Sequence, residues 1–335
     1  MRRAPHRNRI EPSARTMKLK HFFSSLLIAG ACLTAASAQA QSVLIGKNGW
    51  LFYAPDNLTA AAKPGIDNSV QLMRAAQDAL QARGIGLVVL VAPLKARLAE
   101  DKLPDGTAIA PAARDRYANI IASLRNAGIQ TVDLMPVLKS VEHDGQTAFF
   151  PKDAHWTAWS AEAAAAATAD VIGQNWKLGG DAGTGTPLGG WIKERHFSDL
   201  SQFMTAAQRK EIGQEIYAVR AIQPESGDLL GGAAAPVHVI GNSFVQPYLG
   251  YPQALSHALD RRVGLTWKYG NFGPWFMFLE YLESPAFRQA RPQVIVWQFN
   301  EIQVMFGPNT SGQWDASSLV SEDNWRSRVQ AAVSK

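Results

Sequence analysis

The chain has 335 residues, of which 47% are hydrophobic and 18% are charged. It holds 33 Lys and Arg against 28 Asp and Glu, but residues 1–40 contain seven of these bases and one acid, which leaves 26 bases against 27 acids in the rest. Residues 41–335 are therefore nearly neutral and lack the basic surface that nucleic acids require. We expect no nucleic-acid partner, and a partner that is neutral or weakly charged.

The first forty residues have the pattern of an export signal. A basic segment at residues 17–21 precedes an apolar run at residues 22–33, and Ala38-Gln39-Ala40 is a small-x-small cleavage site. The apolar run is shorter than the roughly 20 residues that a membrane span needs. We therefore predict a cleaved signal peptide at residues 1–40, with an uncleaved membrane anchor as the alternative. Cys32 is the only cysteine and would leave with the signal, so no disulfide is expected.

Apolar patterns in the remaining chain alternate between strands and helices. After a turn and a short strand at residues 46–53, they predict a helix at 66–83, a buried strand at 86–92, a helix at 111–127 and a strand at 129–134. An alanine-rich helix at 157–172 has Thr157 as its N-cap, and strands at 237–240 and 294–297 enclose a helix at 275–281. This alternation predicts a three-layer α/β domain around a mainly parallel sheet.

Residues 177–236 interrupt the alternation. They contain a glycine-rich loop at 179–190 and a short polar helix at 205–213, and they have few large apolar residues. Long loops of this kind are often functional or mobile. We interpret the region as an insertion or lid within one domain that spans residues 41–335.

Asp153 and His155 form the first candidate for chemistry. In an extended segment, side chains two residues apart share a face, so the carboxylate can hold one imidazole nitrogen while the other nitrogen faces a substrate. The positive end of the helix after Thr157 opposes an imidazolium and Asp153 favours it, a balance that would keep the pKa near neutrality. Taken alone, an Asp-x-His is better explained by a loop histidine with a structural hydrogen bond.

Ser243 is the second candidate, because it follows an apolar strand and a Gly241-Asn242 turn. Ligands of open α/β sheets bind beyond the carboxyl ends of the strands, where this turn presents the hydroxyl. The amide of Ser243 could donate to an oxyanion. Taken alone, the serine could simply cap the next segment. With His155 as base and Asp153 as orienting acid, it completes the minimum set for acyl transfer through a serine ester.

Two further side chains are weaker candidates. Trp156 adjoins the candidate base and is the aromatic that we would place in a substrate groove, with packing under the following helix as the alternative. Asn271 lies in a loop before the aromatic helix and could donate its amide to an oxyanion, although a plain turn asparagine explains it too. The chain has no GxSxG elbow, HExxH, EF-hand loop, P-loop or GxGxxG. We therefore predict no metal site, no cofactor and no α/β-hydrolase fold.

The order of several short motifs resembles a known family, the bacterial alginate O-acetyltransferases of the AlgJ/AlgX type. The similarity spans roughly residues 44–303. Its motifs are Gly46-Lys-Asn-Gly-Trp-Leu-Phe52, Val91-Ala-Pro-Leu-Lys95, Asp153-Ala-His-Trp156, Gly241-Asn-Ser-Phe244, Tyr281-Leu-Glu-Ser284 and Pro292-Gln-Val-Ile-Val-Trp297. Each motif is modest alone, and the ordered set is specific.

The resemblance implies an SGNH-hydrolase-like domain with Ser243 as nucleophile, His155 as base and Asp153 as orienting acid. The acid and the base precede the serine, as if an ordinary SGNH hydrolase were circularly permuted. The resemblance further implies a periplasmic enzyme, or one held at the inner membrane if the signal is uncleaved. Its acceptor would be an exopolysaccharide such as alginate, and a membrane-bound acyltransferase would supply the acetyl group.

The chain departs from the family pattern in two ways. Asn242 stands where typical SGNH proteins have Asp, and Trp297-Gln298 replaces a Trp-Glu pair, which leaves the role of that acid open. The chain also ends soon after the catalytic domain, which favours the single-domain AlgJ type. Two alternatives remain open: a carbohydrate acetylesterase with the same triad, and a non-catalytic polysaccharide-binding component of a secretion complex.

Overall fold

The computed structural model describes residues 42–221 and 235–335. The predicted signal peptide lies outside these residues. Within them, no helix is long and apolar enough to cross a membrane.

Five strands form the central sheet, in the spatial order β4-β3-β9-β7-β8. Their bounds are Gln130–Thr131 (β4), Gly86–Ala92 (β3), Val294–Asn300 (β9), Val237–Gly241 (β7) and Val263–Trp267 (β8). Every neighbouring pair is parallel. The apolar runs of β3 and β9 are buried on both faces, as expected of strands covered by helices on either side. The predicted α/β class with a mainly parallel sheet is confirmed.

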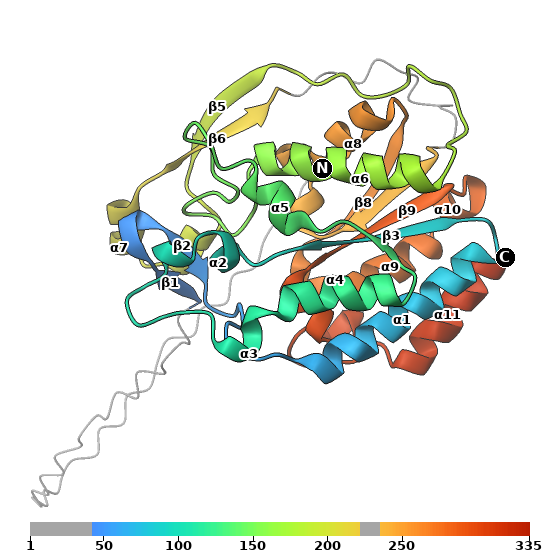
Figure 1. Ribbon diagram of the computed structural model, residues 1–335, viewed down its shortest axis with the longest axis horizontal. Helices are drawn as coiled ribbons and strands as arrows, with labels where there is room; N and C mark the ends of the chain where they lie inside the picture. Colours follow the sequence, from blue (N-terminus) through green and yellow to red (C-terminus); the bar gives the residue numbers. More distant parts are fainter. Residues whose placement is uncertain (1–41, 222–234) are drawn as a thin grey trace, which may run out of the picture. The chain divides into compact units, whose positions relative to one another are not determined.

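Helices cover both faces of the sheet (Figure 1). One face packs against α1 (Lys63–Gln81), α4 (Arg116–Asn126), α9 (Pro274–Leu282) and α11 (Glu322–Ser334). The other face packs against α5 (Leu134–Lys139), α6 (Ala158–Asn175) and α8 (Tyr251–Leu259). Shorter helices are α2 (Lys95–Leu98), α3 (Pro111–Arg114) and α10 (Pro285–Gln289). Two apolar cores, one on each face, therefore hold the three layers together.

Most predicted elements agree with the structure, and the differences have local causes. Thr157 caps α6 as predicted, since its side chain accepts a hydrogen bond from the amide of Ser160. The strand predicted at 129–134 ends at Thr131, because the Asp133 carboxylate accepts from the amide of Met135 and starts α5 there. β8, α8 and α11 were not predicted from the sequence.

The region at 177–236 contains more structure than predicted. Trp191–His196 (β5) and Glu215–Arg220 (β6) pair as an antiparallel hairpin, and α7 (Ala206–Ile212) is capped by Thr205. The short helix is confirmed. The hairpin was missed because β5 is mostly polar and exposed, so it has no buried apolar run. Near it lies a second small antiparallel sheet of β1 (Val43–Ile45) and β2 (Leu51–Tyr53) (Figure 1).

Candidate active site

The carboxyl end of β7 and the loop before α6 supply the central residues of the site. Ser243 follows β7 and begins a short 3₁₀ turn, Ser243–Val245. His155 lies just before α6, in a loop tied back on itself by an isolated bridge between Phe149 and Trp156. Because both segments end at the same edge of the sheet, residues 88 positions apart in the chain come into contact.

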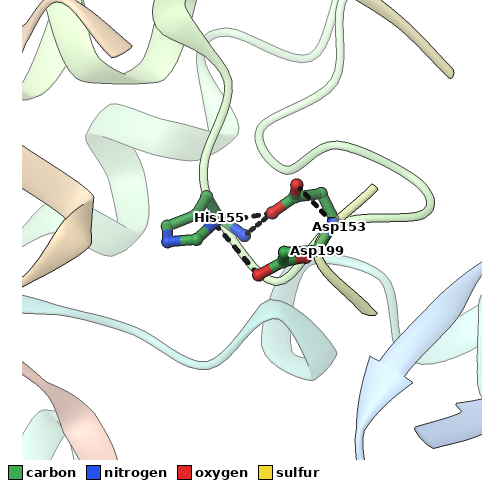
Figure 2. A group of neighbouring side chains, drawn as sticks. All are labelled: Asp153, His155 and Asp199. Carbon is green, nitrogen blue, oxygen red and sulfur yellow. Dashed lines mark hydrogen bonds and ion pairs between the residues drawn. The ribbon is translucent and has the colours of Figure 1, made fainter. Parts of the chain in front are cut away.

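Asp153, His155 and Ser243 form a continuous hydrogen-bonded chain. The Nε2 atom of His155 lies 2.7 Å from Ser243 Oγ, and its Nδ1 atom lies 2.6 Å from Asp153 Oδ1. Figure 2 shows the imidazole with Nδ1 directed to the carboxylates and the other nitrogen directed away from them. A hydroxyl, an imidazole and a carboxylate in this order can move a proton off the hydroxyl oxygen.

A second carboxylate contacts the same imidazole nitrogen. Asp199 Oδ2 lies 3.3 Å from His155 Nδ1 (Figure 2). Its Oδ1 atom accepts from the amide of Ala154 at 3.0 Å. Asp199 lies between β5 and a 3₁₀ turn at Leu200–Phe203, within the insertion. The insertion therefore contributes directly to the environment of the histidine.

Asp153 is held by four hydrogen bonds, all of which it accepts. Its Oδ1 atom accepts from Nδ1 and from the amide of His155, at 2.6 and 2.9 Å. Its Oδ2 atom accepts from the Tyr217 hydroxyl at 2.6 Å and from the amide of Asp199 at 3.3 Å. The carboxylate is buried and has no rotational freedom left, so it fixes the orientation of the imidazole ring.

The two carboxylates favour the charged form of the histidine. Burial lowers the pKa of His155, but hydrogen bonds and charges from Asp153 and Asp199 outweigh it and raise the pKa to about 10. For Asp153, burial raises the pKa, but the hydrogen bond and charge of His155 bring it below its usual range. The sequence predicted a pKa near neutrality for His155, with Asp153 as the single carboxylate beside it. Asp199, from a distant part of the chain, is a second carboxylate, and it raises the pKa of the imidazole further.

Asn242 and Gln298 hold the serine turn in place. The amide of Asn242 donates to Gln298 Oε1, and its side chain donates to Asn300 and Gln303, each at 3.0 Å. Asn242 Oδ1 accepts from the amide of Phe244 at 2.9 Å. A Cβ on Gly241 would lie only 2.7–2.8 Å from Val245 and Gln298 atoms, so the close approach needs glycine. The two departures from the family pattern are therefore structural amides that support the turn.

We expect Gln298→Leu to destabilise the protein by about 1–3 kcal/mol, since it leaves the buried amide of Asn242 without an acceptor. Urea unfolding of the variant and the wild type measures this difference. Gln298→Glu is the matched variant: it keeps an acceptor for Asn242 but loses the donor to Asn300. Equal unfolding midpoints for Gln298→Leu and the wild type would show that this contact does not support the turn.

Lys95 binds the backbone of the segment that contains Asp153. Its buried ammonium donates to the backbone carbonyls of Leu51, Pro151 and Asp153 at 2.6, 2.7 and 3.0 Å. Burial lowers the pKa of Lys95 to about 7, although nearby carboxylates oppose the shift. The motif at residues 91–95 thus contributes to the site by joining β2 to the loop of Asp153 and His155.

A cavity of about 600 Å³ opens over Ser243 and His155. Residues of the insertion and of the loops after β7 and β8 line it together with the central residues: Asp153, His155, His196, Phe197, Asp199, Gln202, Phe203, Tyr217, Ser243, Gln246, Tyr248, Leu249 and Tyr269. The cavity is large enough for a sugar unit, and the hydroxyl of Ser243 is accessible from it.

Similarity to known proteins identifies the family. Residues 43–301 match the family described as the SGNH hydrolase-like domain of the acetyltransferase AlgX. The chain belongs to this family. The resemblance inferred from the motifs is confirmed, and so is the SGNH-like fold.

Several relatives agree with this assignment. The probable alginate O-acetylase AlgJ of Pseudomonas putida is 31% identical over 302 residues, which cover 84% of this chain and 77% of AlgJ. The alginate biosynthesis protein AlgX of Pseudomonas aeruginosa is 26% identical, over 75% of this chain and 54% of AlgX. The solved O-acetyltransferase domain of Pseudomonas putida AlgJ is similar with a TM-score of 0.68 and 28% identity, covering 87% of this chain and 99% of the domain.

The structure of this AlgX-family chain corrects one predicted binding residue. Trp156 has no exposed surface: its indole donates to the carbonyl of Phe244 at 2.8 Å and stacks on Tyr251. The ring packs beneath the serine turn, so the prediction that it lies in a substrate groove is wrong. A tryptophan next to a buried segment can face either side, and here the helices α6 and α8 enclose it.

Asn271 does not join the other site residues. It is exposed, it does not line the cavity, and its backbone carbonyl accepts from the amide of Asp315. Tyr269, two residues earlier, faces the cavity instead. Asp199 and Tyr217, which contact His155 and Asp153 from the insertion, were not predicted. No motif in the insertion distinguishes these two residues from their neighbours.

Asp153, His155 and Asp199 also form the one group of three acidic or histidine side chains, within residues 42–221 and 235–335, that is compact enough to share a metal ion. Their ligand atoms lie within 4.8 Å of one another. A cation there would have to replace the proton that His155 Nδ1 shares with the carboxylates. The short contact of Nδ1 with Asp153 is that of a hydrogen bond, so we assign a proton to this position.

Proposed function

We propose that this protein is an O-acetyltransferase that carries an acetyl group on Ser243 and transfers it to a hydroxyl of an exopolysaccharide. One observation carries the proposal: His155 Nε2 lies 2.7 Å from Ser243 Oγ while its Nδ1 is bound to Asp153. The names of the relatives support the reaction, because AlgJ of Pseudomonas putida is described as a probable alginate O-acetylase.

In the first step, His155 Nε2 accepts the proton of Ser243, and Oγ attacks the carbonyl carbon of the acetyl donor. The amide of Ser243 is the donor that we assign to the resulting oxyanion. The bond to the leaving group then breaks, the leaving group takes the proton from His155, and an acetyl ester of Ser243 remains. Proton transfer of this kind contributes about 10²–10⁴-fold to a rate.

In the second step, a sugar hydroxyl enters the cavity and gives its proton to His155 Nε2. Its oxygen attacks the ester carbonyl, Ser243 leaves and recovers the proton, and the acetylated sugar departs. Water can follow the same route, so a transferase must favour the sugar. Phe197, Phe203 and Asp199 of the insertion line the cavity, where a bound acceptor would keep water from the ester.

Location and partners follow from the predicted signal peptide and the relatives. We propose that the protein acts in the periplasm after export, and that a membrane-bound acyltransferase supplies its acetyl group. Fractionation of cells, with sequencing of the N-terminus, tests this location. An N-terminus at Gln41 in the periplasmic fraction supports export with cleavage, whereas an intact N-terminus in the membrane fraction supports the anchored alternative.

Intact-mass spectrometry after exposure to an activated acetyl ester tests the reaction. We expect an acetyl group on Ser243 that passes to an oligosaccharide faster than to water. Discharge to water alone, in the presence of acceptors, would favour the carbohydrate acetylesterase. No adduct, with saccharide binding that survives Ser243→Ala, would favour the non-catalytic binding protein.

The second carboxylate predicts a shift in pH dependence. His155 must be neutral to accept a proton, so activity rises as the pH passes upward through its pKa, which lies at about 10. Asp199→Asn removes a negative charge 3.3 Å from Nδ1, which lowers that pKa. We therefore expect the rising limb of the pH–rate profile to move to lower pH in this variant.

The acetylation rate of Ser243, measured across pH for both proteins, checks this shift. Glu194→Gln is the matched control, because Glu194 contacts His196 and Tyr248 rather than His155. An unchanged limb in Asp199→Asn would mean that Asp199 does not act on the charge of His155.

A further inference from the structure

Within residues 42–221 and 235–335, no Lys or Arg lines the cavity, while Asp153 and Asp199 contribute two carboxylates to it. Residues 222–234 are not described by the structure, and their sequence contains no Lys or Arg either. The near-neutral composition left room for a local basic groove, and the cavity lining does not provide one.

The cations of neighbouring segments are occupied elsewhere. Arg220 lines an adjacent cavity that shares Tyr248, but it forms two hydrogen bonds with the Glu162 carboxylate, at 2.6 and 3.0 Å, and lies over the ring of Trp191. Lys268, beside the cavity residue Tyr269, pairs with Glu280 at 2.9 Å.

Two further cations near the cavity bind backbone carbonyls. Lys152, next to Asp153, donates to the carbonyls of Ile212 and Gln214, and Arg209 donates to those of Ser201 and the cavity residue Gln202. Arg195 alternates along β5 with His196, which faces the cavity, so it points to the opposite side of the hairpin. None of these cations lines the cavity.

Carboxylates outnumber cations in the cavity lining. Asp153 and Asp199 line it with a single imidazolium, that of His155, and Glu194 adds a further carboxylate beside the cavity residues His196 and Tyr248. The ammonium of Lys95 lies behind Asp153, where it binds three backbone carbonyls and does not line the cavity. A carboxylate on a ligand would be repelled here and would have to lose its water without gaining a partner.

The cavity instead offers exposed rings and neutral amides. Phe197, Phe203 and Tyr269 line it with 49%, 60% and 69% of their surface exposed. Three exposed rings that line one cavity form an apolar patch of the kind that marks a binding site, and flat rings suit the C–H faces of sugars. The amides of Gln202 and Gln246 also line the cavity and can bond hydroxyl groups.

From this lining we propose that the acceptor is a neutral saccharide, bound against Phe197, Phe203 and Tyr269, and not a polyuronate. The inference rests on the proposed acetyl transfer and adds the chemical class of its acceptor. It separates this protein from its relatives that are named for alginate, whose sugars each carry a carboxylate.

A matched pair of acceptors tests the class. Oligosaccharides of mannose and of mannuronate, of equal length and with the same linkage, differ only in the group at C6. With the acetyl enzyme preformed on Ser243, we expect transfer to the neutral sugar to be at least about tenfold faster, because only the uronate is repelled by the carboxylates of the cavity lining. Binding of both sugars to Ser243→Ala, measured by calorimetry, should show the same order.

The outcomes separate the two proposals. If Ser243 takes up no acetyl group, the proposed function fails. If the acetyl enzyme forms and the uronate is bound and acetylated as well as the neutral sugar, or better, the function holds and the inference on the acceptor is wrong. Binding of neither sugar by Ser243→Ala would also overturn the inference.

A ring variant tests where the sugar binds. Tyr269→Ala removes the most exposed ring of the cavity, and we expect the acceptor KM to rise roughly tenfold, the scale of one lost aromatic contact. Ile216→Ala is the matched control, because Ile216 is 51% exposed on β6 but does not line the cavity. An unchanged acceptor KM in Tyr269→Ala, Phe197→Ala and Phe203→Ala alike would place the sugar elsewhere.

Discussion

Replacing Ser243 with Ala should abolish acetyl transfer, by about 10⁴-fold or more, because no other atom at this position can form the ester. The variant loses one oxygen at the edge of a cavity and keeps the turn, which Asn242 and Gln298 hold through hydrogen bonds that do not involve the hydroxyl. We therefore expect an unchanged unfolding midpoint and no acetyl adduct by mass spectrometry.

Ser140→Ala is the matched control for this variant, since Ser140 is an exposed serine at the end of α5 whose hydroxyl bonds only a local carbonyl. It should be acetylated on Ser243 like the wild type. Transfer at the wild-type rate by Ser243→Ala would rule out the acyl-enzyme mechanism, and an adduct on another residue would identify a different nucleophile.

Asp153→Asn should reduce acetyl transfer by about 10⁴-fold while preserving the size of the side chain. The carboxylate accepts four hydrogen bonds, two on each oxygen, from His155, Tyr217 and the amide of Asp199. An amide has only one acceptor oxygen, so its NH₂ group faces two donors whichever way it turns. His155 then loses its position or carries its proton on the wrong nitrogen.

The comparison with Asp199→Asn makes this prediction specific. Both carboxylates touch His155 Nδ1, but Asp153 does so at 2.6 Å and Asp199 at 3.3 Å. We expect a large loss of maximal rate in Asp153→Asn and mainly a shift of pH dependence in Asp199→Asn. Rates of Ser243 acetylation measured for both variants across pH give the test. Similar rate losses would mean that the two carboxylates share the orienting role.

The class of fold and the chemical groups of the site were readable from local patterns. The continuous apolar runs of β3 and β9 predict strands buried on both faces, because only a covered parallel sheet makes such runs favourable. The Gly-Asn turn after β7 predicts a serine presented at the strand end, and the spacing of Asp153 and His155 predicts their contact. These inferences involve residues close together in the chain, where backbone geometry restricts the outcome.

The irregular parts of the fold were less predictable. The first strand of the hairpin, β5, is exposed and mostly polar, so its sequence does not differ from that of a loop, and β6 was missed with it although it is largely buried. The stability of the hairpin comes from pairing and from contacts with the rest of the domain, which a single strand does not reveal. For this reason Asp199 and Tyr217 were missed, although both contact Asp153.

By itself, the sequence determined that this protein has a parallel α/β core, a serine on a strand-end turn and an Asp-x-His pair, because each follows from the local spacing of residues. Only the tertiary structure decided that His155 meets Ser243, that Trp156 is buried, that Asn271 stays outside the cavity and that a second carboxylate reaches the imidazole. The physical reason is that these contacts join segments tens of residues apart. Their distances depend on strand order and side-chain packing, which local propensities do not specify.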